Sequence, residues 1–204
     1  MQLLLSVLST VLLAGTAPAA NSKPAAPALG TATFAGGCFW CMETAFEGKP
    51  GVKTVISGYT GGFKDNPTYE EVSSGGTGHA ESVQVTYDPR VTSYAKLLDI
   101  YWHNIDPTQA DGQFCDHGNQ YRSAIFYGSE AEKLAAEASR RTVAAQLKKP
   151  VVTQIVAATR FYPAEDYHQD FYKKNPLRYR TYRLGCGRDA RLKQLWGKLP
   201  ETAH

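Results

Sequence analysis

Residues 31–46, TATFAGGCFWCMETAF, place a short β-strand, two glycines and the start of a helix in immediate succession. Residues 31–35 predict the strand, and residues 39–47 predict a helix that ends at Gly48. Cys38 lies between them, in the first turn of the helix, where backbone N–H groups have no partner inside the helix. Those donors and the helix dipole favour a thiolate. The junction therefore predicts a reactive cysteine.

Strands and helices alternate on the C-terminal side of this junction. Apolar periodicity predicts strands over residues 52–59, 79–87, 121–127 and 151–159, and helices over 94–102, 129–148 and 163–174. The order β-α-β-β-α-β, followed by α-β, predicts an α+β fold: a two-layer sandwich with a split βαβ (ferredoxin-like) core. Two long irregular stretches, 60–78 and 105–120, interrupt this order, and we expect the functional site in these loops.

The N-terminal 19 residues predict an export signal. They carry no charged side chain, their apolar core is too short to span a bilayer, and Ala17-Pro18-Ala19 has the small-x-small pattern of a cleavage site. We expect a signal peptide over 1–19, a linker over 20–31, a catalytic domain over 32–185 and a basic tail over 186–204. The mature protein would then be periplasmic or secreted.

Composition excludes several classes of protein. The 204 residues are 43% hydrophobic and 20% charged, which is the balance of a folded globular chain and not of a disordered or multi-span membrane protein. The net charge of only +3 gives no reason to expect a nucleic-acid partner. We therefore expect neither a nucleic-acid nor a membrane partner. As a separate expectation, the protein is taken to be a monomer.

Four cysteines leave three interpretations open. Cys38 and Cys41, three residues apart at a helix start, have the spacing of a thioredoxin-like disulfide oxidoreductase, or they form a structural bridge. All four cysteines, which are Cys38, Cys41, Cys115 and Cys186, would instead make a zinc site, with His79 and His117 as substitute ligands. Only one half of the usual paired Cys-x-x-Cys spacing is present, which disfavours zinc.

Several separated motifs, taken in order, resemble one known family. They are GGCFWCMETAF over 36–46, GYTGG over 58–62, NPTYEEVSSGGTGHAESVQVTYDP over 66–89, DPTQ over 106–109 and DHGNQYRSAIFY over 116–127. With these motifs the chain resembles the class A peptide methionine sulfoxide reductases from about residue 31 to residue 175. The resemblance implies a thiol-dependent reductase of methionine S-sulfoxide, free or in proteins.

The resemblance also implies roles for individual residues. Reduction of a sulfoxide needs a soft nucleophile at sulfur and a proton at oxygen; these would be Cys38 and Glu81, the latter kept protonated by burial. The remaining matches are substrate-binding positions: Phe39 and Trp40 against the S-methyl group, and Tyr69, Asp116 and Tyr121 around the sulfoxide oxygen.

The family chemistry leaves Cys38 as a sulfenic acid, which a second thiol condenses to a disulfide. We rank Cys186, on a glycine-flanked segment, first for this resolving role, Cys41 second and Cys115 third. No bound cofactor and no metal is expected, and a thioredoxin-type dithiol would recycle the enzyme. The alternative is a general thiol–disulfide oxidoreductase that uses Cys38 and Cys41.

Overall fold

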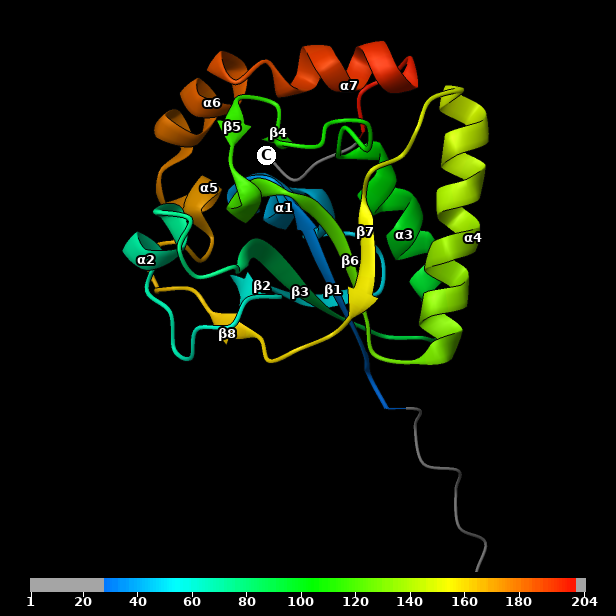
Figure 1. Ribbon diagram of the computed structural model, residues 1–204, viewed down its shortest axis with the longest axis horizontal. Coiled ribbons are helices and arrows are strands. Elements are labelled where there is room, and N and C mark those ends of the chain that lie inside the picture. The colour runs from blue at the N-terminus through cyan, green and yellow to red at the C-terminus, as the bar shows by residue number, and fades with distance from the viewer. Residues whose placement is uncertain (1–27, 201–204) are drawn as a thin grey trace, which may run out of the picture.

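A computed structural model describes residues 28–200 (Figure 1). The predicted signal peptide over 1–19 and most of the predicted linker over 20–31 lie outside the described residues. Within 28–200, no helix combines the length and apolar character needed to cross a membrane.

A six-stranded sheet forms the centre of the domain. Its strands are β1 (Gly30–Gly36), β2 (Val52–Thr60), β3 (Ala80–Tyr87), β6 (Ser123–Tyr127), β7 (Gln154–Ala157) and β8 (Tyr162–Pro163). Their order across the sheet is β7-β6-β1-β3-β2-β8. Because β1 pairs antiparallel with both β3 and β6, and β2 antiparallel with β3, the two β-α-β units interlock. This interlocking confirms the predicted α+β fold with a split βαβ core.

Three helices cover one face of this sheet (Figure 1). They are α1 (Phe39–Phe46), α3 (Tyr94–His103) and α4 (Glu130–Leu147), which begins after the N-cap Ser129. Phe34 of β1 is fully buried beneath them and stacks on Phe46 and Tyr101, with ring centroids 5.2 and 5.1 Å apart. Such aromatic packing fixes α1, and with it Cys38, against the sheet.

The shorter elements lie around the end of the sheet where β1 meets α1 (Figure 1). The irregular stretches contain α2 (Tyr69–Ser73), the hairpin β4 (Gly112–Gln113) and β5 (Asp116–His117), and the 3₁₀ turn η1 (Asn119–Tyr121). The C-terminal part adds α5 (Phe171–Lys174), α6 (Pro176–Gly185) and α7 (Arg188–Trp196).

Two predicted elements differ from the structure. The helix predicted over 163–174 exists only as its last turn, α5. The preceding residues instead hydrogen-bond to β2, where the Gln169 side chain accepts from Ser57 N and donates to Ser57 O, both at 2.9 Å. The strand predicted over 151–159 is confined to β7, a largely exposed edge strand that pairs parallel with β6.

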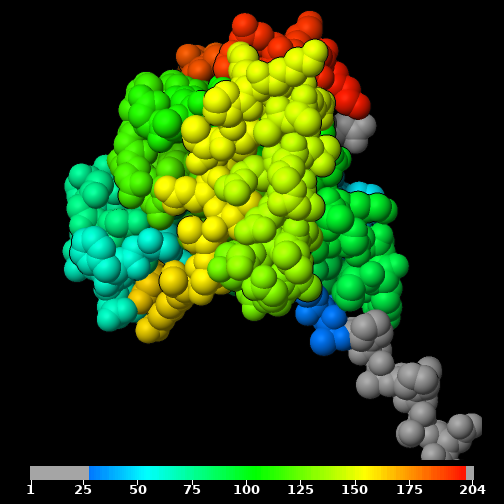
Figure 2. Space-filling model, turned by 45° about the vertical axis from the view of Figure 1, so that its right-hand side comes forward, coloured from blue at the N-terminus to red at the C-terminus, as the bar shows by residue number. Residues whose placement is uncertain are grey.

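The segment predicted as a basic tail is helical and packed over residues 188–196. Leu192 is fully buried, and Arg188, only 1% exposed, donates from Nη2 to the carbonyl oxygens of Gly36 (3.0 Å) and Asn104 (2.8 Å). In Figure 2 these C-terminal residues (red) lie at one end of α4 (yellow-green). Helix α7 is thereby tied to the end of β1 that precedes Cys38.

Candidate active site

Cys38 is held at the junction of β1 and α1. Gly37 has φ +80, and a Cβ there would lie 2.5 Å from Gln113 Cβ, so this position requires glycine. Cys38 is the N-cap of α1 and is 6% exposed. The predicted turn from strand to helix therefore places its sulfur at the rim of the core.

Glu81 lies beside Cys38 at the start of β3. Its Oε2 accepts a hydrogen bond of 3.0 Å from Phe39 N, in the first turn of α1, and its side chain is 2% exposed. Burial, reinforced by the nearby Asp116 and Cys41, raises the pKa of Glu81 to about 8. The carboxyl therefore holds a proton at neutral pH.

The ionisation of the cysteine pair differs from the sequence prediction. Burial and the adjacent Cys41 raise the pKa of Cys38, whereas a hydrogen bond from Cys38 and the charges of Arg188 and Arg183 lower the pKa of Cys41 to about 6. In the substrate-free protein Cys38 is therefore the thiol of the pair and not the thiolate that the helix start predicts.

Aromatic side chains form one wall of the site. The Trp40 indole stacks on Phe171 with centroids 3.6 Å apart and donates from Nε1 to His168 Nδ1 at 3.1 Å. The Phe39 ring packs against Tyr59 and His168 at 5.9 and 5.0 Å. Both rings are thus held in fixed orientations by neighbours outside the site.

Polar groups from β5, α2 and α6 also reach the site. Asp116 on β5 accepts a short hydrogen bond from the Tyr182 hydroxyl of α6. Burial raises the pKa of Asp116, and burial together with Glu81 raises the pKa of Tyr69 on α2 to about 12. Tyr69 therefore remains a hydroxyl donor at neutral pH, as a ligand with a basic oxygen would require.

These groups share a cavity of about 230 Å³. It is lined by Cys38, Phe39, Trp40, Tyr69, Glu81, Asp116, Tyr121, Arg178 and Tyr182. The first seven are residues that the sequence predicts. Arg178 and Tyr182 were missed, although the helical spacing of Tyr179 and Tyr182 with Arg178 in the C-terminal segment could have indicated a helix facing the site.

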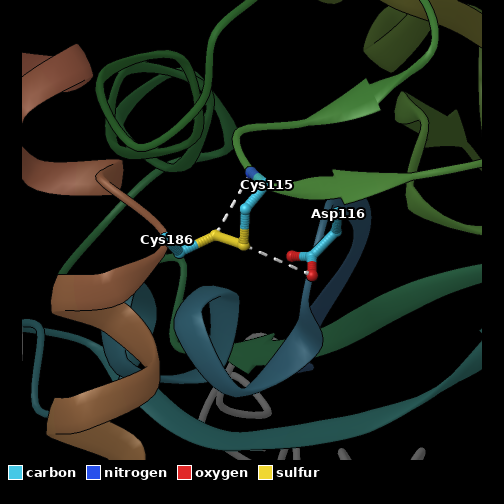
Figure 3. Close-up of side chains that lie close together, drawn as sticks. All are labelled: Cys115, Asp116 and Cys186. Atoms are coloured by element: carbon cyan, nitrogen blue, oxygen red, sulfur yellow. Dashed lines mark hydrogen bonds between the residues drawn. A yellow bond between two sulfur atoms is a disulfide. The ribbon is translucent and has the colours of Figure 1, made fainter.

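Cys186 does not line this cavity. It is joined to Cys115 by a disulfide with an S–S distance of 2.02 Å (Figure 3), while Cys38 and Cys41 are free thiols. Cys115 N also donates to Cys186 Sγ at 3.2 Å. Which cysteine attacks an oxidised Cys38, with Cys186 ranked first on sequence, stays a prediction.

The set proposed for zinc is divided between these two pairs. Within residues 28–200, the one group of three metal-capable side chains close together is Cys115, Asp116 and Cys186, and two of its sulfurs are already bonded to each other. His79 uses both ring nitrogens, with Gly62 N and Lys64 O, and His117 lies on the surface near Asp111. These contacts give both histidines ordinary structural surroundings.

Fold and site together define a class of protein. A thiol and a proton-bearing carboxyl line one aromatic-walled cavity at the end of a ferredoxin-like sheet. A nucleophile and a proton donor are the two groups that a thiol-dependent oxidoreductase needs. The family model described as "Peptide methionine sulfoxide reductase" matches residues 30–200. The chain belongs to this family and is an oxidoreductase.

Individual relatives agree with this membership. The chain is 54% identical over 169 residues to the peptide methionine sulfoxide reductase MsrA of Bacillus licheniformis, covering 82% of this chain and 93% of that protein. It is 55% identical over 168 residues to the MsrA of Bacillus subtilis, covering 81% and 95%.

Solved structures agree as well. Mxr1 from Saccharomyces cerevisiae in reduced form matches with a TM-score of 0.70 and 32% identity, covering 76% of this chain and 89% of that one. Methionine sulfoxide reductase A of Corynebacterium diphtheriae matches with a TM-score of 0.66 and 34% identity, covering 76% and 78%.

Proposed function

We propose that this enzyme reduces methionine S-sulfoxide, free and within proteins, to methionine without a bound cofactor. The observation that carries the proposal is the shared cavity, which Cys38 and Glu81 both line. The Glu81 carboxyl accepts a hydrogen bond from the backbone N–H of Phe39, the residue directly after Cys38. The aromatic rings of Phe39 and Trp40 suit an S-methyl group, because sulfur and its substituents pack well on aromatic surfaces.

The first chemical step uses these two groups together. The Cys38 thiolate attacks the sulfoxide sulfur while Glu81 donates its proton to the sulfoxide oxygen. Oxygen is then transferred to Cys38, giving methionine and the Cys38 sulfenic acid, so the substrate sulfur is reduced and the cysteine sulfur is oxidised. Tyr69, Tyr121 and Asp116 are proposed to hydrogen-bond around the sulfoxide oxygen as its charge changes.

Cys38 loses its proton only when the substrate is bound. The raised pKa of Cys38 keeps it a thiol in the empty site, with its hydrogen directed at Cys41. When Glu81 donates its proton to the sulfoxide oxygen, the sulfoxide sulfur becomes more electrophilic. The same proton neutralises the negative charge that would otherwise develop on that oxygen during the attack. Cys41 is placed to receive the Cys38 proton as the attack proceeds.

The catalytic cycle closes with a thiol from the same chain and an external dithiol. A second cysteine of the chain condenses with the sulfenic acid, and a thioredoxin-like protein reduces the resulting disulfide. A related fold, Mxr1 from Saccharomyces cerevisiae, has been solved in complex with Trx2, which motivates this choice of reductant.

The test is turnover of both sulfoxide epimers with dithiothreitol as reductant. We expect reduction of the S epimer, little reduction of the R epimer, and loss of turnover in Cys38→Ser. Insulin reduction by the wild-type enzyme in the absence of any sulfoxide would favour the general thiol–disulfide oxidoreductase instead.

We also propose that the protein is exported and acts as a monomer. The export proposal rests on the uncharged, apolar residues 1–19 and the Ala17-Pro18-Ala19 pattern. N-terminal sequencing of protein from the producing cell tests it, with Ala20 as the expected first residue. Light scattering of the purified enzyme tests the monomer.

A further inference from the structure

Cys41 lies one helical turn after Cys38 and packs against Tyr179 of α6, behind the cavity. Its backbone N donates to Cys38 O at 3.1 Å, and its side chain shares a hydrogen bond with the Cys38 thiol. It is 1% exposed and packs in a small cluster with Phe171 and Tyr179. Cys41 is thus a nucleophile that solvent hardly reaches but that contacts the reacting cysteine.

A hydrogen-bonded chain from α6 ends at Cys41. Arg183 Nη1 donates to the Tyr179 hydroxyl at 3.1 Å, and that hydroxyl lies 2.8 Å from Thr44 Oγ1, which also donates to Cys41 O at 2.9 Å. Because the Tyr179 oxygen accepts from a guanidinium, its own hydrogen is available to donate to Thr44 or to the Cys41 sulfur. Tyr179 itself is 2% exposed.

The charges around Cys41 favour its ionised form. Arg183, 6% exposed, is held by Asp189 at 3.0 and 2.6 Å, and Arg188, 1% exposed, approaches from α7 with its Nε unpartnered. The titratable and charged groups that act on Cys41 or are acted on by it are Cys38, Glu81, Tyr179, Tyr182, Arg183 and Arg188. The hydrogen bond from the Cys38 thiol contributes most to lowering the pKa of Cys41, and Arg188, Arg183 and Tyr179 add to it against the opposing effect of burial.

We infer that Cys41 is the resolving cysteine, and that Tyr179 and Arg183 of α6 are positioning residues that hold it beside Cys38. The inference rests on the proposed function. The Cys41 sulfur attacks the Cys38 sulfenic sulfur, the S–S bond forms, and the S–O bond breaks. The leaving oxygen takes the proton that Cys41 received from Cys38 and departs as water; Cys41 is oxidised and Cys38 is reduced to the disulfide level. This assignment differs from the sequence ranking, which places Cys186 first.

The Cys115–Cys186 disulfide is consistent with this assignment. Both of its sulfurs are already oxidised, so neither can attack a sulfenic acid until a reductant opens the bond. Cys41 needs no such step and no large movement. An enzyme isolated with the Cys115–Cys186 bond intact would therefore still complete one turnover to a new disulfide.

The first experiment is a single turnover without reductant, using enzyme whose Cys115–Cys186 disulfide is intact. We expect one equivalent of methionine and loss of both free thiols. Mass spectrometry should show one peptide that contains Cys38 and Cys41, has lost two hydrogens and takes up no alkylating agent. A Cys38–Cys186 or Cys38–Cys115 linkage would overturn the inference. Absence of methionine would instead overturn the proposed function.

The second experiment tests the roles of Tyr179 and Arg183. It measures the rate of disulfide formation as a function of pH. Tyr179→Phe keeps the ring but removes the hydroxyl, so we expect the pH midpoint of this step to move upward by about one unit. At neutral pH the step slows about tenfold, and high pH restores it. Methionine release, measured in the same samples, should be affected less than disulfide formation.

Tyr172→Phe is the matched control: the Tyr172 ring packs against the same cluster, but its hydroxyl donates to Glu47, the C-cap of α1, so its loss should not move the midpoint. Arg183→Gln changes another member of the hydrogen-bonded series that ends at Cys41, and it should move the pH midpoint in the same direction. An unchanged midpoint in variants with wild-type circular dichroism would show that Tyr179 and Arg183 only support packing.

Discussion

The two cysteine pairs of this enzyme differ in how the chain brings them together. Cys38 and Cys41 are neighbours because one helical turn separates them, and both are buried free thiols. Cys115 and Cys186 are 71 residues apart and meet only because the β4–β5 hairpin and the α6–α7 junction pack against each other. The local pair lies where chemistry needs a fixed geometry, and the distant pair lies at the surface, where it fastens two loops.

The two cysteine pairs also differ in their neighbours: titratable and charged groups surround the local pair, and open space flanks the distant pair. The local pair sits among a carboxyl with a raised pKa, two buried arginines and several tyrosines, which together set its ionisation. The distant pair is flanked by Gly185 and Gly187, around which an added Cβ would meet no atom within 4 Å. This contrast predicts large effects on rate from changes near the first pair and effects on stability from changes at the second.

The largest effect is expected from Cys38→Ser. A hydroxyl replaces the soft nucleophile, and no other free thiol lines the cavity among the described residues. We expect methionine formation to fall by at least about 10³-fold, as it does when covalent nucleophiles are removed. Single-turnover methionine release measures this directly. Activity within tenfold of wild type would place the reaction at another thiol.

Glu81→Gln should have the next largest effect. The amide keeps the shape and accepts from Phe39 N, but it cannot release a proton to the sulfoxide oxygen, so kcat/KM should fall about 10²- to 10³-fold. The protonated form of Glu81 is the active one. Wild-type activity should therefore be full below its pKa and decline as pH rises through about 8. This alkaline decline should disappear in Glu81→Gln; its persistence would assign the proton to another group.

How far the sequence predicts the structure depends on the same contrast between local and distant features. The turn from β1 into α1, the N-cap at Ser129 and the alternating strands are all dictated by residues within one or two turns of each other, and the structure contains each of them. The seven residues predicted from motifs meet in one cavity, because motifs in order along a chain imply the fold that gathers them.

Features that depend on distant partners were not predictable in this way. No local signal shows that Cys186 pairs with Cys115, or that Gln169 bonds to the backbone of Ser57 in a segment where β8 and a turn replace most of the predicted helix. The ionisation of Cys38 and Cys41 likewise depends on Arg183, Arg188 and Glu81, which come from three other elements. Such tertiary contacts override local propensity.

Removing the distant disulfide should lower stability by an intermediate amount. The bond closes a loop across a sequence separation of 71, for which loop entropy gives an upper value of about 4 kcal/mol; disulfides typically contribute about 2–4 kcal/mol. We expect the double variant Cys115→Ser, Cys186→Ser to lose that much free energy of unfolding in urea. Wild-type enzyme with this bond reduced should unfold at the same urea concentration as the variant. A variant as stable as the oxidised wild type would show that the bond does not restrain the unfolded chain.

The smallest expected effect tests whether the Cys115–Cys186 disulfide helps to position Asp116 in the cavity. The disulfide and the Tyr182–Asp116 hydrogen bond connect the same two segments, since Tyr182 lies one turn before Cys186 and Asp116 directly follows Cys115. While the disulfide is closed, Tyr182→Phe should cost only about 1 kcal/mol, or about fivefold in kcat/KM, because the covalent link still holds Asp116 near the cavity.

With the disulfide removed, the hydrogen bond is the remaining link close to Asp116, and the same substitution should cost more. A double-mutant cycle of Tyr182→Phe with the double serine variant measures this difference, with a coupling of about 1 kcal/mol expected in kcat/KM. Additive effects would mean that the distant pair stabilises the fold without helping to position the cavity. Coupling would mean that the redox state of the distant pair also adjusts how firmly Asp116 is held for the reaction at Cys38.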